Sequence, residues 1–237
     1  MKKAIIIGGT SGIGHGIAEQ LLKKDYHVFI TGIERDFIKD VQQGHINGLE
    51  AYYLDCIQEN ASEVLPKLVE KLGGLDLLVN SAGIGNLNKN LGHKVENQAN
   101  QLNVLAFTEI MDWGYRFFEK QGYGNLVGIT SIAGLFGSRV APAYHAAKSY
   151  QITYLQSLKN KAKKSGLPIY ITDIRPGFVK TPMTEGKKMF WVANKETAAK
   201  QIVALVEKRK SFGYISKRWV LIASLIKIIP TWLRVYL

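Results

Sequence analysis

Short apolar runs alternate along the chain with longer segments in which apolar residues recur every three or four positions. The short runs are rich in β-branched and aromatic residues and predict strands; they cover residues 4–8, 27–31, 50–54, 75–80, 125–130, 168–174 and 212–216. The longer segments predict helices near residues 12–24, 35–43, 59–72, 96–120, 143–164 and 195–210. Continuously apolar strands separated by helices indicate a parallel sheet covered on both faces, so we expect an α/β fold with a doubly wound sheet.

The length and composition fit one globular domain. The chain has 237 residues, of which 46% are hydrophobic and 21% charged, and an α/β domain of this size can bury a large core. The single cysteine, Cys56, cannot form an internal disulfide, and the first apolar run is too short for a signal peptide. We therefore expect a cytoplasmic protein that does not depend on an oxidising compartment.

The net charge of +12 favours an anionic partner. A phosphate-bearing cofactor, nucleic acid and a membrane surface all fit this charge, whereas the lysines of residues 159–164 are better explained as a solvated helix face. The sequence has no zinc-finger, RNA-binding or basic DNA-reading pattern, so we expect no nucleic-acid partner. We also expect no metal site.

A glycine-rich turn follows the first predicted strand. Gly8, Gly12 and Gly14 form the pattern G-x-x-x-G-x-G immediately before an amphipathic helix. Glycines permit a tight turn and let the backbone approach a pyrophosphate, while the free N–H groups at the helix start attract negative charge. Because the turn lies between a strand and a helix, dinucleotide binding is favoured over a plain connecting turn.

The segment AYHAAK, residues 143–148, combines a phenol and an amine at helical spacing. Tyr144 and Lys148 are four residues apart and would share one face of a helix. A positive charge beside a phenol lowers the pKa of the phenol, which would produce a tunable proton donor. A tyrosine and a lysine at this spacing also occur by chance, so the pair alone does not establish a catalytic site.

Together with the glycine spacing, this pair resembles the short-chain dehydrogenase/reductase family, whose fold is a Rossmann-type doubly wound sheet. The resembling segments follow the family's order: GGTSGIG (8–14), VNSAG (79–83), LNVLA (102–106), ITSIAG (129–134), AYHAAK (143–148) and IRPGFVKT (174–181). Two positions depart from the family pattern, with Ile7 in place of a common threonine and Ser81 in place of an asparagine. Both departures concern structural hydrogen bonds of the turn and the fourth strand.

The resemblance implies an NAD(P)-dependent oxidoreductase with four catalytic residues. Tyr144 would be the acid or base, and Lys148 would lower its pKa and bind the nicotinamide ribose. Ser131 would donate a hydrogen bond to the substrate oxygen, and Asn103 would hold a water linked to Lys148. The structural alternatives are a helix cap for Ser131, a packed amide for Asn103 and a buried phenol for Tyr144.

The same resemblance implies the set of cofactor contacts. They are Gly8, Thr10, Ser11, Gly12, Ile13, Gly14, Gly32, Arg35, Asp55, Asn80, Ala82, Gly83, Tyr144, Lys148, Pro176, Gly177, Val179 and Thr181. Gly32 stands where the family's NAD-selecting acid would be, and Arg35 is nearby, although Glu34 is as well. We therefore favour NADP over NAD. Asp55 could equally be a cap at a strand end.

The substrate and the tail are less defined by the sequence. We expect residues 1–216 to form the dinucleotide-binding catalytic domain, with a substrate lid at about 182–196. Four large apolar side chains in this lid, Met183, Met189, Phe190 and Trp191, favour an apolar ketone, aldehyde or secondary alcohol, although they could simply pack the lid down.

Residues 217–237 form an amphipathic tail with a narrow polar stripe, made of Ser224, Lys227, Thr231 and Arg234, and with Pro230 interrupting the helix. The tail fits a membrane interface, a groove in a second subunit and the substrate mouth about equally well. Since the family is commonly dimeric or tetrameric, we expect a homo-dimer or homo-tetramer. The competing functions are a dinucleotide-binding regulatory protein without turnover and a peripheral membrane protein anchored by its tail.

Overall fold

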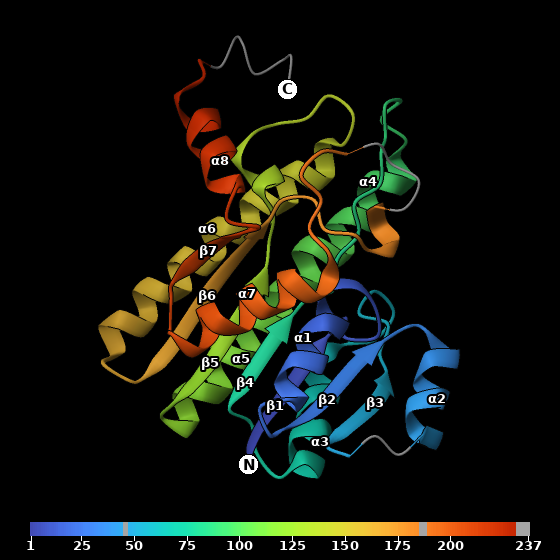
Figure 1. Ribbon diagram of the computed structural model, residues 1–237, viewed down its shortest axis with the longest axis vertical. Helices are drawn as coiled ribbons and strands as arrows, with labels where there is room; N and C mark the ends of the chain where they lie inside the picture. The colour runs from blue at the N-terminus through green and yellow to red at the C-terminus, as the bar shows by residue number, and fades with distance from the viewer. Residues whose placement is uncertain (45–46, 185–188, 231–237) are drawn as a thin grey trace.

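The computed structural model describes residues 1–44, 47–184 and 189–230. In this part of the chain, strands form a seven-stranded parallel sheet in the order β3-β2-β1-β4-β5-β6-β7. The strands are β1 Lys2–Ile7, β2 Tyr26–Gly32, β3 Leu49–Tyr53, β4 Leu77–Asn80, β5 Gly124–Ile129, β6 Ile169–Pro176 and β7 Phe212–Ile215. All seven lie within a few residues of the runs predicted from the sequence, and the doubly wound α/β fold is confirmed (Figure 1).

Helices cover both faces of the sheet because the strands are apolar on both sides. One core is closed by α1 Gly12–Leu22, α2 Arg35–Gly44 and α7 Lys195–Glu207. The other core is closed by α3 Ala61–Leu72, α5 Phe107–Gln121 and α6 Pro142–Ser165. Within β1 the side chains alternate accordingly, since Ala4 and Ile6 enter the first core and Ile5 and Ile7 enter the second.

The strand order reverses between β1 and β4. The chain runs outward from β1 to β2 and β3, then returns to place β4 on the other side of β1. Ile7 and Asn80, the last residues of these two strands, are register partners. Loops that leave the carboxyl ends of two such strands diverge, and the crevice between them is where ligands bind in open α/β sheets.

The segment predicted as one helix over 96–120 has a more complex structure. It consists of α4 His93–Asn100, a π-helical turn Gln101–Ala106 and α5. Helical structure is continuous across these three parts, so the helix predicted near 96–120 is present, and the π-helical turn within it is a feature that apolar periodicity does not reveal. Such turns are frequent at functional sites, and this one carries Asn103, which is fully buried.

The described part of the tail forms a helix, α8 Trp219–Ile228, which ends before Pro230. α8 packs against β7 and against the short 3-10 turn Ile132–Leu135, at the same end of the molecule as the start of α6 (Figure 1). Trp219, Ala223 and Ile226 are the buried residues of the described part of this helix. Two members of the polar stripe predicted for the tail, Thr231 and Arg234, lie outside the described residues.

Candidate active site

The glycine-rich turn has the shape of a phosphate cradle. Gly8 has φ of +72° and Gly12 has φ of +54°, values that favour glycine. A Cβ on Gly14 would lie 2.1 Å from the carbonyl oxygen of Gly8, so the turn closes only because that side chain is absent. Ser11 is the N-cap of α1, and its side chain does not cap the first N–H groups of that helix, which a ligand can therefore approach. This open helix start and close backbone turn fit a dinucleotide pyrophosphate, and the contacts of Thr10 and Ile13 with it stay predictions.

The loop after β4 closes against this turn. A Cβ on Gly8 would lie 2.6 Å from the backbone nitrogen of Ala82, which shows how closely the two loops approach. The buried Asn80 holds its own loop by accepting a hydrogen bond from Ala82 N–H at 3.1 Å. Gly83 lies deeper, since a Cβ there would be 3.0 Å from the Asn103 Oδ1 and 3.5 Å from the Lys148 Nζ. The loop after β4 therefore lies beside Asn103 and Lys148.

The Pro-Gly segment completes the cofactor side of the site. It leaves β6 at Pro176, and a Cβ on Gly12 would lie 3.3 Å from the Thr181 methyl group, so the segment reaches the glycine-rich turn. Gly177 has no room for a side chain, because a Cβ there would lie 2.1 Å from the ring of Trp219. Val179 forms an isolated parallel bridge with Ala193, which ties the segment to the start of α7.

Asp55 follows β3 and is engaged locally. Its Oδ1 accepts a hydrogen bond from the Ile57 N–H at 2.9 Å, and its own N–H donates to Glu59. This geometry is that of an Asx turn, the structural alternative for this residue. The contact between Asp55 and the cofactor stays a prediction.

An acid after β2 reaches the glycine-rich turn. The Glu34 carboxylate accepts hydrogen bonds from the Thr10 hydroxyl, from the Ser11 hydroxyl at 3.1 Å and from the Ile33 N–H at 3.2 Å. Gly32 adjoins this network so closely that a Cβ there would overlap the Thr10 hydroxyl. Glu34 therefore places a carboxylate on the glycine-rich turn. It stands two residues after Gly32, which occupies the position of the family's NAD-selecting acid.

Arg35 points away from this network. Its guanidinium carbon lies 3.8 Å from the centroid of the Tyr53 ring, a cation–π contact at the edge of the sheet. Arg35 is exposed and begins α2, and its contact with a cofactor stays a prediction.

Ser131 and Tyr144 meet at the carboxyl end of β5. Ser131 is the N-cap of the 3-10 turn that begins at Ile132, and its hydroxyl accepts from the Ala133 N–H at 3.0 Å. Burial raises the pKa of the Tyr144 phenol, and a hydrogen bond with the Ser131 hydroxyl opposes that rise. Ser131 therefore has the cap role that was its structural alternative, and its hydrogen bond to the substrate oxygen stays a prediction. Gly85 packs on the Tyr144 ring, with its Cβ position 3.0 Å from the nearest ring atom.

Lys148 lies one turn along α6 from Tyr144 and is 4% exposed. Its Nζ is 5.7 Å from the centroid of the Tyr144 ring. It donates hydrogen bonds to the Ile129 carbonyl at 3.1 Å and to the Gln151 Oε1 at 2.9 Å. Burial lowers the pKa of Lys148 to about 7, although the attraction of Asp173 opposes this change.

Asn103 is joined to Lys148 through Gln151. The Asn103 side chain is occupied by the loop after β4, because its Oδ1 accepts from the Ile84 N–H at 3.1 Å and its Nδ2 donates to the Ile84 carbonyl at 2.8 Å. The Asn103 backbone carbonyl accepts from the Gln151 Nε2 at 2.8 Å. The amide of Gln151 therefore spans the two residues that the resemblance links by a water.

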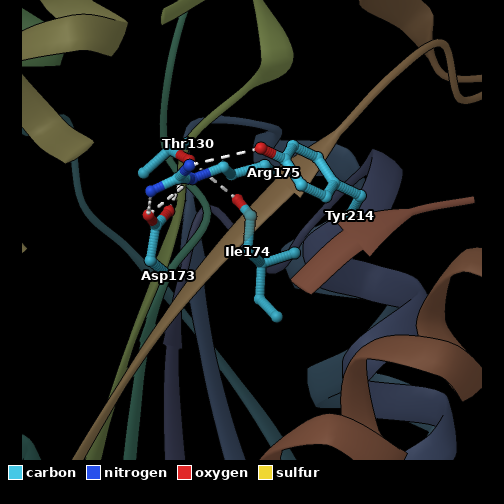
Figure 2. Close-up of polar contacts among 5 residues, drawn as sticks. All are labelled: Thr130, Asp173, Ile174, Arg175 and Tyr214. Atoms are coloured by element: carbon cyan, nitrogen blue, oxygen red, sulfur yellow. Dashed lines mark hydrogen bonds and ion pairs between the residues drawn. The ribbon is translucent and has the colours of Figure 1, made fainter. Parts of the chain in front are cut away.

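A buried ion pair supports the strand ends beneath the site. Figure 2 shows the Asp173 carboxylate facing Thr130 and the Arg175 guanidinium, with Tyr214 on the opposite side of the guanidinium. Asp173 is fully buried; it accepts from the Thr130 hydroxyl at 2.7 Å and from the Arg175 Nε at 2.8 Å. Thr130 also donates from its hydroxyl to the Ile174 carbonyl. The network fixes the backbone of β5 immediately before Ser131.

Aromatic side chains gather where the lid segment meets α8. The ring of Trp219 has its centroid 5.3 Å from Phe178, 5.2 Å from Phe190 and 6.2 Å from Trp191. Trp219 is 2% exposed, whereas Phe190 is 55% and Trp191 40% exposed. We call these four residues the aromatic cluster. Part of the lid, residues 185–188, lies outside the described residues.

The sequence interpretation missed three of these residues. Gln151 could have been suspected because it lies three residues after Lys148 on the same helix face. Asp173 carried a weaker signal, an acid inside an otherwise apolar strand. Trp219 had no local signal, since its contact with Gly177 joins segments that are 42 positions apart, as the numbering of the two residues shows.

Two classes of feature are not found in the part of the chain that the structure describes. Over residues 1–44, 47–184 and 189–230, no helix has the length and apolar character needed to cross a membrane. The same residues contain no group of three or more His, Cys, Asp or Glu side chains placed to hold a metal ion.

Comparison with known proteins identifies the family. The family model described as short chain dehydrogenase matches residues 2–190. An uncharacterized oxidoreductase of Staphylococcus epidermidis is 26% identical over 78% of this chain and 81% of its own length. The 15-hydroxyprostaglandin dehydrogenase [NAD(+)] of Rattus norvegicus is 30% identical over 78% of this chain and 70% of its own. Among solved structures, ElxO with NADP bound has a TM-score of 0.81 and 25% identity, and the match covers 93% of this chain and 99% of that one. The chain belongs to the short-chain dehydrogenase family of oxidoreductases.

Proposed function

We propose that this protein transfers a hydride between NADP(H) and an apolar ketone, aldehyde or secondary alcohol, with Tyr144 as the acid/base. The observation that carries the proposal is the convergence of Ser131, Tyr144 and Lys148 beside a cradle that fits a dinucleotide. A protein that only binds the cofactor has no need for a lysine that lies beside a phenol and whose burial disfavours its charged form. This argues against the alternative of a regulatory protein without turnover.

Each side chain has a role that follows from its contacts. The cofactor, when bound, supplies or accepts the hydride, which no side chain can do. Ser131 and Tyr144 donate hydrogen bonds to the substrate oxygen, where negative charge develops during reduction. Tyr144 then gives that oxygen its proton, or removes one in the oxidative direction. Lys148 lies close enough to favour the phenolate electrostatically, and its ammonium would also hold the ribose hydroxyls of the cofactor.

The NADP(H) preference has support and one opposing contact. The ElxO structures contain NADP and, in a variant with tyrosine replaced by phenylalanine, NADPH, and an arginine, Arg35, begins the helix that follows β2. By contrast, the Glu34 carboxylate occupies the hydroxyls of Thr10 and Ser11 that a 2′-phosphate would approach. Glu34 is exposed and therefore free to rotate away on the surface. We propose that NADP(H) binds with Glu34 displaced from the glycine-rich turn.

The substrate class follows from the aromatic cluster. Phe190 and Trp191 expose apolar surface at the segment that follows the cofactor-binding Pro-Gly, and the buried Trp219 backs them. Val192 is also exposed. Apolar surface at the mouth of a site selects ligands that gain by leaving water. The rat relative is named for a hydroxyprostaglandin, which agrees with this class.

The proposed assembly is a homo-dimer or homo-tetramer. The outer face of α8 exposes Leu221 at 68%, Leu225 at 50% and Ile228 at 76%. Contiguous exposed apolar side chains usually mark an interface. A second subunit is one occupant of this face and a membrane surface is another, and replacing the three side chains by serine separates the two.

The experiment that tests the function is Tyr144→Phe, which removes the hydroxyl and keeps the ring. A panel of apolar ketones and aldehydes is screened for oxidation of NADPH by the unmodified protein, and a substrate from the panel is then given to the variant. Turnover should fall by about 100-fold or more, the usual contribution of acid–base catalysis, while NADPH binding followed by fluorescence should persist. Tyr150→Phe is the matched control, because Tyr150 is an exposed tyrosine on the same helix. Equal turnover in Tyr144→Phe and the control would refute the mechanism.

A further inference from the structure

Gln151 is a fully buried polar residue with both ends of its amide in use. Its Oε1 accepts from the Lys148 Nζ at 2.9 Å, and its Nε2 donates to the Asn103 backbone carbonyl at 2.8 Å. Gln151 stands on α6, three residues after Lys148, so the first contact is local. The second contact crosses to the π-helical turn, 48 positions away in sequence. The amide therefore joins two elements at the centre of the site.

The direction of these hydrogen bonds is fixed by the chemistry of the groups. Lysine ammonium and backbone carbonyl are a pure donor and a pure acceptor. Between them the amide can point only one way, with its oxygen toward Lys148 and its nitrogen toward Asn103. A water in this position could reorient and pass a proton along, whereas an amide nitrogen has no lone pair with which to accept one.

We infer that Gln151 is a positioning residue of the proposed reaction, whose amide links the Lys148 ammonium to the Asn103 carbonyl in place of a water. This inference rests on the proposed function, because it assigns Gln151 a role through Lys148. It has two consequences. Lys148 gains a permanent acceptor that stabilises its charged form, and the path from Lys148 to Asn103 through this amide is closed to proton transfer.

Asp173 stabilises the charged form of Lys148, and other titratable groups lie near the start of α6. Asp173 attracts Lys148 from β6, and the charge of Asp173 is itself shared with Arg175. On α6 itself, Tyr144 and His145 are neighbours along the helix, and Glu96 of α4 accepts from the N–H of Ala143 at the start of α6. Gln151 supplies the side-chain oxygen that accepts directly from the Lys148 Nζ, so its replacement should alter the titration of Lys148.

Two variants of opposite expected sign test the inference. Gln151→Met keeps the length and the helix propensity of the side chain but removes the acceptor. A hydrogen bond to a charged group is worth enough to change a pKa by about 1, so the pKa of Lys148 should fall by about 1. Gln151→Glu places a carboxylate against the ammonium and should raise the pKa of Lys148 by about 1 to 3.

The titration needs neither cofactor nor substrate. Lysines are labelled with carbon-13 at the ε-methylene, and the Lys148 signal is assigned by its absence from the spectrum of Lys148→Met. Shifts of opposite sign in the two variants support the inference. An unchanged Lys148 titration in both folded variants overturns it, since a merely structural Gln151 would alter only the melting temperature. Equal turnover in Tyr144→Phe and its control would refute the proposed function, and it would not change the result of this titration, so the two failures can be told apart.

A measurement on the unmodified protein decides the matter where a variant does not fold. The side-chain amide protons of Gln151 should exchange with solvent far more slowly than those of the exposed Gln43, because the former are buried and bonded. Exchange as fast as that of Gln43 would overturn the inference. Where the protein turns over a substrate, Gln151→Met should also move the tyrosine limb of the kcat/KM profile to higher pH, because Lys148 carries less charge beside Tyr144.

Discussion

Replacing Lys148 by methionine should remove a pH-dependent loss of stability that the active site imposes on the fold. Lysine in an unfolded chain titrates near 10.5, whereas burial lowers the pKa of Lys148 to about 7 in the folded protein. Between these values the unfolded state binds one proton more than the folded state. Stability therefore rises with pH from about 7 to 10.5 and is lowest below that window, where the buried lysine must be charged.

The magnitude follows from the two pKa values. One proton corresponds to a slope of about 1.4 kcal/mol per pH unit, and the whole difference is worth about 5 kcal/mol. Lys148→Met abolishes this slope but leaves the Ile129 carbonyl and the Gln151 Oε1 without their donor, at a cost of about 1 to 3 kcal/mol each. The slope is therefore the informative quantity, since the cost of the lost bonds does not depend on pH.

The assay is urea unfolding of the unmodified protein and of Lys148→Met at several pH values from about 7 to about 10, the window in which the slope is expected. Subtracting the free energy of unfolding of Lys148→Met from that of the unmodified protein cancels the contributions of the groups that the two proteins share. This difference should rise by about 1.4 kcal/mol per pH unit. Lys164→Met is the control, because it removes an exposed positive charge from the same helix. A difference that stays flat across this range would refute the assignment of Lys148 as a buried lysine with a lowered pKa.

The contacts of other residues lead to three further expectations. Glu34→Gln removes the acid from the glycine-rich turn and should raise the ratio of NADPH affinity to NADH affinity by about tenfold, as measured by fluorescence titration. An unchanged ratio would show that Glu34 has no part in the choice between the two cofactors. Asp173→Asn leaves its arginine partner without a carboxylate and should lower the free energy of unfolding by about 3 kcal/mol; a loss below about 1 kcal/mol, measured in urea, would contradict the buried pair. Replacing Leu221, Leu225 and Ile228 by serine removes the exposed apolar face of α8. The change should lower the oligomeric mass if that face contacts a subunit, or weaken binding to anionic vesicles if it contacts a membrane. Retention of both properties would mean that the face has neither partner.

Much of the fold could be predicted from the sequence because it depends on local composition. Runs such as AIII at 4–7 are apolar at every position, which is typical of a strand buried on both faces. The glycines at 8, 12 and 14 indicate a backbone shape directly, because two of them have positive φ and the third has no room for a side chain. The position of the cradle therefore follows from the amino-acid sequence alone.

The proposed catalytic pair could also be found from the sequence. Tyr144 and Lys148 are four residues apart on one helix, so their common face follows from helix geometry alone. The sequence could not show the state of Lys148, however, because its pKa depends on burial by segments that come from β5, the π-helical turn and the loop after β4.

Only the tertiary structure decided the contacts between distant segments. Glu34 reaches Thr10 because the ends of β1 and β2 are adjacent in the sheet, and Gln151 reaches Asn103 because α6 packs on the π-helical turn. Trp219 likewise became part of the site by covering Gly177. The sequence determined which backbone shapes and helix faces were available, since these depend on neighbours along the chain. The packing of those elements determined which side chains meet, because a contact across many residues has no periodic or compositional signal in the sequence.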